Sequence, residues 1–488
     1  MNGTEMAFRI LMVAKLKVNF LSYQRSEILL LIVFIAVNLL IYSLSFDSYA
    51  PLAAGADAGQ YLRPARSLVD YGEFTMNPPG WTPEMGESKS FTFGTPLYSI
   101  FLAIPYFLFG QNEYFYAAVI IMQCSLLYFT GWLSRLFLPF FNSSRVILIH
   151  ALVVFNPNSL TTAHLIQSET LFTLFIVLSV LNIFKYIRHG SINSLIYSGI
   201  FAGLLTLTRP AGLYFVYAIP FIFLAIIFLR SMQNQEANSI ITKEALLSVF
   251  LPVLIAFLVM SPWYARNYIN SNEVFLTSES GTYLKDNYQT LIQRGRGLTE
   301  KEAFDYTNDQ KMSYFVENGV SLNCMTDERD PNCGDHVFNA VFNGLINEPI
   351  KNHAKALFYS WGVLYFSGGA SNFRNYVGLE GNSIIVDFHR EKFNGFSSMS
   401  RLIKRMNNEY LFIFIVFTGF AFIARFFALI GLIKSLRRSE NFSYLIVILG
   451  TIIVFTAMYL YLGQSRFRAP LEPLLILLTV LAFSNKKK

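Results

Sequence analysis

The sequence has 488 residues, of which 53% are hydrophobic, 16% aromatic and only 14% charged. Soluble domains carry roughly 25% charged residues. A water-soluble globule of this length cannot bury so much apolar surface, so lipid must solvate part of it. The composition excludes an ordinary soluble enzyme and predicts an all-α, polytopic membrane protein with about ten to twelve spans.

The net charge of +7 is concentrated beside the hydrophobic runs. Positive charge of this kind marks the cytoplasmic flanks of membrane spans and is attracted to anionic lipid. We therefore expect residues 1–27 to form a cytoplasmic tail, and we do not expect nucleic acid as a partner. The flanking basic residues are Arg9, Lys15, Lys17, Arg25 and the triplet 486–488.

The first hydrophobic run, residues 28–46, is too long for the core of a signal peptide and is interpreted as a retained span. An outer loop, residues 47–113, follows. Its polar part, 47–93, holds about six acids and three bases, in contrast to the basic tail, and is expected outside. Residues 97–110 are apolar but short, and Pro105 interrupts them, so we expect a helix that lies in the outer interface.

Longer apolar runs continue to the end of the chain. Residues 192–229 are interrupted by Arg209 and Pro210, which favours two spans joined by a tight outer turn. Residues 356–370 are expected in the interface, which leaves the C-terminus inside. The further spans are expected at residues 114–134, 146–166, 168–184, 192–208, 210–229, 245–263, 410–433, 443–464 and 469–484.

The runs divide the chain into a catalytic membrane module (28–268), an extracytoplasmic or interfacial region (269–409) and C-terminal membrane helices (410–488). The middle region is the expected acceptor side. It holds Cys324 and Cys333, which can form a disulfide if the region lies outside, whereas two separate thiols fit equally well. One Cys pair without nearby His falls short of a four-ligand zinc site.

Charged residues gather at the outer ends of the spans. Ionisable groups in such positions are costly and therefore suggest function. A carboxylate can accept the proton of an attacking hydroxyl. Arginine can hold a phosphate and stabilise the charge that grows on it as it leaves. The combination favours sugar transfer from a lipid phosphate. The residues are Asp57, Glu169, Arg209, Arg266, Arg466 and Arg468.

Each of these residues also has a structural alternative. Asp57 could cap the helix that follows it. Glu169 could be a first-turn acid that the helix dipole favours. The arginines could anchor span ends at the interface. A cavity lined by carboxylates is also compatible with a divalent metal, although the sequence contains no dedicated ligand cluster.

Short motifs follow one another in a definite order along residues 28–268 and near the C-terminal end. They are Asp57-Ala58 with Tyr61, Ala65, Leu68 and Gly72; Pro96-Leu97 and Phe109-Gly110; Ser168-Glu169; Thr208-Arg209-Pro210; Pro262-Trp263 with Arg266-Asn267-Tyr268; and Arg466 with Pro470. In order and spacing they resemble the GT-C superfamily of membrane glycosyltransferases. The nearer branch resembles the dolichyl-phosphate-mannose protein mannosyltransferases and the lipid A aminoarabinose transferases.

The resemblance implies a GT-C fold, a polyprenyl-phosphate sugar as donor and inversion at the anomeric carbon. It implies that Asp57 is the base for the acceptor, that Glu169 lines the same cavity and that Arg266 lies near the donor phosphate. Family members often carry a basic residue or a Pro-Pro pair where this chain has residues 93–96, so another arginine or Lys89 would make that contact. We expect the donor phosphate or substrate to be bound also by Tyr61, Arg209, Arg466 and Arg468.

Two other functions remain open at this point. A transporter or flippase of lipid-linked sugars would place charges at mid-depth, whereas these lie at the outer edge. An oligosaccharide ligase or polymerase would share a lipid-linked donor but release a pyrophosphate. The expected location is a bacterial inner membrane with the active site facing outward. Membrane lipids and a glycan, lipid or protein acceptor are the expected partners.

Overall fold

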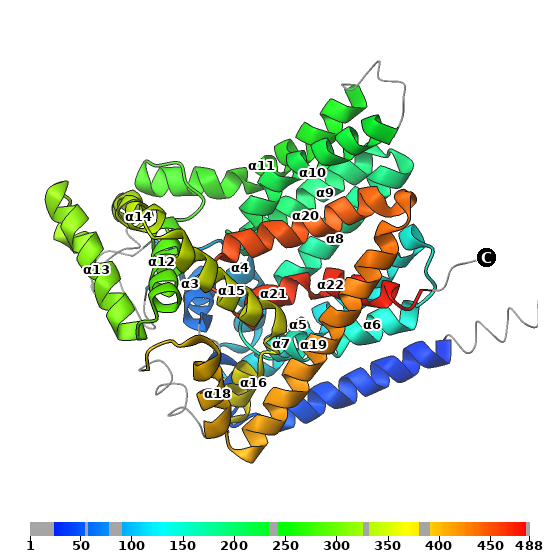
Figure 1. The fold of residues 1–488 in the computed structure, drawn as a ribbon, viewed down its shortest axis with the longest axis horizontal. Coiled ribbons are helices and arrows are strands. Elements are labelled where there is room, and N and C mark those ends of the chain that lie inside the picture. The colour runs from blue at the N-terminus through cyan, green and yellow to red at the C-terminus, as the bar shows by residue number, and fades with distance from the viewer. Residues whose placement is uncertain are drawn as a thin grey trace, which may run out of the picture.

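The computed structural model describes residues 24–53, 57–77, 90–233, 243–325, 331–379 and 391–484. Most of the predicted tail, residues 1–23, lies outside the described residues, as do Lys89 and the triplet 486–488. The prediction of an all-α fold is confirmed (Figure 1). Beside the helices, the described chain has one isolated β-bridge, between Thr75 and Ser90.

Seven helices in the described ranges are long and apolar enough to cross a membrane. A bent pair, α6 (Val146–Val154) and α7 (Pro157–Ala163), meets at 54° and would make an eighth span. The seven are Gln24–Ser43, α5 with the 3-10 turn η2 (Glu113–Phe141), α8 (Glu169–His189), α10 (Gly212–Gln233), α11 (Lys243–Ser271), α19 (Asn408–Leu436) and α20 (Phe442–Tyr459) with the turn before it.

This number is lower than the ten to twelve spans that hydropathy predicts. Two of the apolar helices are short: α4 (Leu97–Phe109) has 13 residues and α9 (Ile192–Thr208) has 17. The expected last span, residues 469–484, consists of a 3-10 turn (Ala469–Leu471) followed by α22 (Glu472–Leu481), and a four-residue helix α21 (Ser465–Arg468) precedes it. Pro470 and Pro473 lack the backbone N–H that a continuous helix needs, which explains the division.

The membrane helices pack closely where small residues allow it. Gly199 and Gly203 lie four residues apart on α9 and face α11. A Cβ atom on Gly199 would lie 2.5 Å from the carbonyl oxygen of Pro252, and one on Gly203 would lie 2.7 Å from the Cβ of Val259. Small residues at this spacing let two membrane helices approach each other at backbone distance. Of the seven candidate spans, α8 is the most buried: 72% of the residues in its 18-residue apolar stretch are buried.

A separate helical unit lies at the end of the molecule opposite the C-terminus (Figure 1). It consists of α12 (Ser280–Arg296), α13 (Glu300–Glu317), α14 (Pro331–Ile346) and α15 (Ile350–Phe366). It has its own core, which includes Tyr288, Leu291, Ile292, Phe315 and Val337. Cys324 and Cys333 are joined by a disulfide, which links the turn after α13 to the start of α14.

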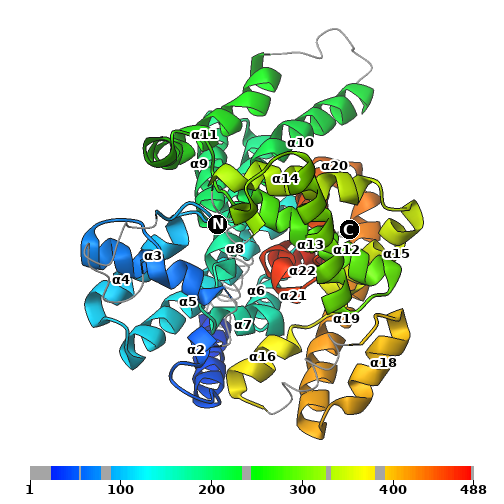
Figure 2. The same ribbon diagram turned by 90° about the vertical axis from the view of Figure 1, so that its left-hand side faces the viewer.

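Shorter helices complete the same end of the molecule. They are α2 (Ala50–Ala53), α3 (Ala58–Tyr71), α16 (Ala370–Val377) and α18 (Gly395–Arg405). Figure 2 looks at this end and shows α3 and α4 on one side and α12 and α15 on the other, with α21 and α22 between them. The label of α8 also lies between these two groups in this view.

Candidate active site

Asp57 immediately precedes α3, but its side chain makes no capping hydrogen bond. Its Oδ2 instead accepts a hydrogen bond from Nη1 of Arg466, at 2.7 Å, across 409 residues of sequence. The Asp57 side chain is 27% exposed and that of Arg466 16% exposed. The capping alternative is thus not what the structure adopts, and the carboxylate is accessible from outside while it is paired.

A second ion pair joins Glu169, in the first turn of α8, to Arg209, in the turn between α9 and α10. The Glu169 side chain is only 2% exposed. Burial alone would lower the pKa of Arg209, but the charge of Glu169 and its hydrogen bond outweigh burial and raise it above the ordinary value. The Arg209 guanidinium therefore stays charged, and its contact with Glu169 holds the start of α8 against the α9–α10 turn.

Tyr61, one turn into α3, connects the two ion pairs. Its hydroxyl lies 3.1 Å from Oγ of Ser168, the residue before Glu169. Burial raises the pKa of Tyr61 to about 12, and the charges of Asp57 and Glu169 act in the same direction. The phenol is therefore neutral at physiological pH and can donate a hydrogen bond. Its ring meets that of Tyr98 edge to face, with centroids 4.8 Å apart.

Two aromatic residues, Phe467 and Tyr459, form a platform beneath the arginines. The guanidinium of Arg466 lies 4.9 Å from the centroid of the Phe467 ring, and that of Arg209 lies 5.9 Å from it. The ring of Tyr459 stacks on Phe467 at 4.3 Å and 9°. Cation–π contacts with one ring orient both guanidinium groups. The hydroxyl of Tyr459 is buried and finds no hydrogen-bond partner among the described residues.

Arg468 does not join this group, contrary to the prediction that it binds substrate. It is fully buried, and its Nε donates to Oε1 of Glu472 at 2.6 Å. The same oxygen accepts from Nη2 of Arg425, at 2.5 Å, in the middle of α19. A second Arg468 nitrogen donates to the carbonyl of Leu364. Arg468 thus belongs to a buried triad, Arg425–Glu472–Arg468, which we call the dry triad.

Arg266 also makes its contacts outside this group of residues. Its guanidinium donates to the carbonyls of Phe91, at 2.6 Å, and Phe74, at 2.7 Å, and lies 4.7 Å from the ring centroid of Trp263. It therefore fastens the outer loop between α3 and α4 onto the end of α11. The donor-phosphate role that the motif order suggests for Arg266 would require these backbone contacts to be given up.

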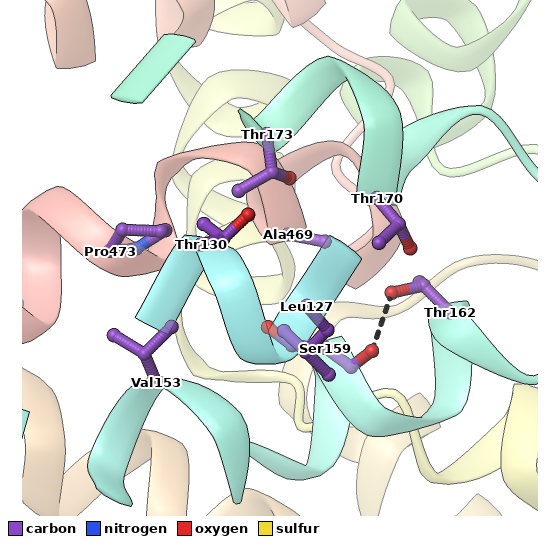
Figure 3. A pocket seen from close by; sticks show the side chains of 9 residues that line it. All are labelled: Leu127, Thr130, Val153, Ser159, Thr162, Thr170, Thr173, Ala469 and Pro473. Carbon is purple, nitrogen blue, oxygen red and sulfur yellow. Dashed lines mark hydrogen bonds between the residues drawn. The ribbon is translucent and has the colours of Figure 1, made fainter. Parts of the chain in front are cut away.

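A small cavity lies beside the first turns of α8 (Figure 3). Its volume is about 10 Å³, which is the size of one water molecule and too small for a sugar or a phosphate. Hydroxyl groups line much of it: Thr130, Ser159, Thr162, Thr170 and Thr173. Within the described ranges, no group of three or more His, Cys, Asp or Glu side chains is placed to hold a metal ion.

The structure therefore brings five of the predicted residues together and separates two. The central group, which we call the Asp57 cluster, comprises Asp57, Tyr61, Glu169, Arg209 and Arg466. The sequence reasoning missed Tyr459 and Phe467. An aromatic residue at a span end is usually an interfacial anchor. Phe467 is distinguished by its contacts with two arginines, and Tyr459 by its stacking on Phe467.

The chain is similar to known proteins in its fold but not in its sequence. No family model and no curated protein matches the sequence. Among solved structures, the oligosaccharyltransferase from Archaeoglobus fulgidus in the apo form matches with a TM-score of 0.50 and 15% identity. The match covers 93% of this chain and 50% of the other, so the chain spans about half the length of that enzyme.

ArnT from Cupriavidus metallidurans, bound to undecaprenyl phosphate, matches with a TM-score of 0.38 and 14% identity, over 93% of this chain and 77% of the other. At such identities a likeness concerns the fold and not the substrate. The match to the oligosaccharyltransferase extends over nearly the whole of this chain. The chain therefore has a fold like that of this oligosaccharyltransferase over about half of the enzyme's length.

Proposed function

We propose that this protein is a membrane glycosyltransferase. It moves a sugar from a polyprenyl-phosphate donor to an acceptor on the extracytoplasmic face of a bacterial inner membrane. The observation that carries the proposal is the Asp57 cluster: a partly exposed carboxylate, two arginines and a neutral phenol held together at the outer ends of different spans. The likeness in fold to GT-C enzymes supports the same class of reaction.

The geometry suggests how the reaction would proceed. Arg466 now pairs with Asp57 and is oriented by Phe467. A lipid phosphate is a strong competitor for a guanidinium, because it accepts two parallel hydrogen bonds. Binding of the donor phosphate by Arg466 would free Asp57 to accept the proton of the acceptor hydroxyl.

In the proposed step, the acceptor oxygen forms a bond to the anomeric carbon while the bond from that carbon to the phosphate oxygen breaks. The proton passes to Asp57 and the electron pair leaves with the lipid phosphate. The guanidinium of Arg466 stabilises the charge that develops on the phosphate. Attack opposite the leaving group inverts the anomeric carbon. Tyr61 can donate to a phosphate or sugar oxygen, since its pKa of about 12 keeps it protonated.

The Glu169–Arg209 pair has a supporting part in this scheme. Glu169 is nearly inaccessible and already saturated by Arg209, which makes it a poor base. It holds Arg209 over the Phe467 ring, and the second guanidinium adds positive potential to the phosphate site. We therefore assign proton transfer to Asp57 alone and treat Glu169 as a positioning residue.

The test is Asp57→Asn in cells that lack the chromosomal copy of the gene. Asn keeps the shape of the side chain but cannot accept a proton, so transfer should fall by about 10²–10⁴-fold. Mass analysis of lipid-linked sugars and surface glycans should show that the donor accumulates and the product disappears. Asp70→Asn is the matched control, since Asp70 lies on the same helix, is exposed, and accepts a hydrogen bond from Tyr106 that Asn can still accept.

Purified protein in liposomes then separates the alternatives. We expect turnover with a polyprenyl-monophosphate sugar and release of the polyprenyl phosphate. Turnover only with a pyrophosphate-linked glycan would indicate a ligase or polymerase instead. Movement of labelled lipid across the bilayer without a new glycosidic bond would indicate a flippase. Full restoration of the glycan by Asp57→Asn would refute the assignment of the base.

A further inference from the structure

The outer helical unit contains a second, larger cavity. Its volume is about 570 Å³, and it lies where the C-terminal turn of α12 meets the N-terminal turn of α15. Gly295 forms part of its wall, and a Cβ atom there would lie 2.9 Å from the Cβ and from the carbonyl oxygen of Asn352. The two helix ends thus approach each other at backbone distance. The lining residues are Gly295, Arg296, Pro349, Lys351, Asn352 and Lys355.

The lining of this cavity is strongly positive. It contains three cations, Arg296, Lys351 and Lys355, and no acidic residue. The nearest carboxylate, Glu348, is 3% exposed and is engaged by Arg296 through two hydrogen bonds and by Asn352 through a third. One carboxylate therefore offsets one of the three positive charges, and a net charge of about +2 faces the cavity.

The two lysines have capacity left for a ligand. Both are exposed, and Lys355 uses one hydrogen bond, at 3.4 Å, to the carbonyl of Gly295. They lie four residues apart, so they project from the same side of α15. An anion between them would meet two ammonium groups and the first turn of a helix, whose N-terminal end favours negative charge.

An exposed apolar stripe runs along α15 next to the lysines. Ile350 is 86% exposed, Phe358 63% and Trp361 41%, and their spacing places them on one helical face. At the far end of α15, Phe366 packs against Phe422 of span α19, with ring centroids 5.5 Å apart. Phe422 is itself exposed on the surface of that span. The helix that carries the stripe thus reaches the apolar surface of a membrane helix at its far end, on a face about 140° around α15 from Trp361.

We propose that this surface binds a phosphate-headed lipid, with the phosphate in the cavity between Lys351 and Lys355 and an acyl chain along the stripe of Ile350, Phe358 and Trp361. The charge of the cavity selects an anion, and the adjoining apolar stripe selects a lipid over a soluble phosphate. The site is separate from the Asp57 cluster, because α12 and α15 form it and neither helix carries a residue of that cluster (Figure 2).

The experiment measures lipid binding to the purified full-length protein by native mass spectrometry. Phosphatidylglycerol is titrated against phosphatidylcholine with the same acyl chains, and inorganic phosphate is added as a competitor. The test variant is Lys351→Ala/Lys355→Ala. The control is Lys301→Ala/Lys392→Ala, which removes two exposed lysines of the same outer region that do not line the cavity. A third variant, Ile350→Asn/Phe358→Asn, interrupts the stripe.

We expect the wild type to prefer phosphatidylglycerol. The cavity variant should bind it about 30-fold more weakly, since each lysine at an anionic lipid surface contributes roughly fivefold. The control should change binding by less than about threefold, because exposed surface charges away from the cavity are screened. The stripe variant should weaken both lipids. Equal binding of both lipids by the wild type, or an equal loss in the control, would overturn the proposal.

Strong competition by inorganic phosphate, together with an unaffected stripe variant, would also overturn it and would indicate a site for a soluble phosphate. None of these measurements requires sugar transfer. Their failure would therefore leave the assignment of Asp57 untouched, and an active Asp57→Asn enzyme would leave the lipid site untouched.

Discussion

The dry triad makes a prediction about charge balance inside the membrane domain. Glu472 is fully buried, and its Oε1 accepts from both Arg425 and Arg468. Two positive charges and one negative charge are therefore enclosed together. In addition, Nε and Nη1 of Arg425 and Oε2 of Glu472 lack a hydrogen-bond partner within the described ranges. The three residues together therefore carry a net charge of +1.

The two possible single replacements should have opposite consequences. Glu472→Gln keeps an acceptor oxygen but removes the only negative charge, which leaves two buried guanidinium groups uncompensated. Breaking a buried ion pair in this way costs about 3–5 kcal/mol. Arg425→Met removes the surplus cation together with its unpartnered nitrogens, and leaves a neutral Arg468–Glu472 pair. No uncompensated charge then remains, and an uncompensated charge is what makes the loss of one partner of a buried pair costly.

The assay is equilibrium unfolding of both variants in the same mild detergent, followed by tryptophan fluorescence. We expect Glu472→Gln to lower the free energy of unfolding by about 3–5 kcal/mol. We expect Arg425→Met to change it by less than about 1 kcal/mol in either direction. If Arg425→Met destabilises the protein as much as Glu472→Gln does, the three residues contribute through specific contacts, and the argument from net charge is wrong.

Two further predictions concern packing and the disulfide. A Cβ atom on Gly431 of α19 would lie 1.8 Å from the carbonyl oxygen of Leu478, whereas Gly419 on the same helix has nothing within 4 Å. Gly431→Ala should therefore force α19 away from α22 and lower the free energy of unfolding by at least about 1–3 kcal/mol. Gly419→Ala should raise it by up to about 1 kcal/mol. Equal unfolding midpoints for the two variants would contradict the packing. The Cys324–Cys333 disulfide closes a loop with a sequence separation of 9, so Cys324→Ser/Cys333→Ser should cost the outer helical unit about 2–3 kcal/mol. Limited proteolysis at α13 and α14 should become faster in that variant, and an unchanged cleavage rate would show that the bond adds no stability.

The sequence predicted what depends on local pattern. The positions of most apolar helices follow from runs of hydrophobic residues, and the break between α9 and α10 follows from Arg209 and Pro210. The presence of charged groups next to the ends of apolar helices follows from the same pattern. The division of residues 469–484 into a 3-10 turn and α22 could not be predicted in this way, because hydropathy alone gives little weight to Pro470 and Pro473.

The pairing of charges could not be predicted from sequence. Arg466, Phe467 and Arg468 are consecutive, yet Arg466 faces Asp57, whereas Arg468 faces Glu472 and Arg425. Which arginine meets which carboxylate depends on how α21 packs against α7 and α15. That placement depends on contacts between helices that are far apart in the chain. The same reason explains why Arg266, which has a suitable motif position, is engaged by backbone carbonyls instead.

The contact between Asp57 and Arg466 also has a consequence for biosynthesis. The two residues are 409 positions apart, and ribosomes that add about 5–20 residues per second need roughly 20–80 s to make the stretch between them. During this interval the first spans insert while the Asp57 carboxylate has no partner. The proposed site is completed only when α21 docks after nearly every span is in place. A chain that stalls before α21 would therefore insert into the membrane yet stay inactive, so activity itself reports that synthesis has reached the last helices.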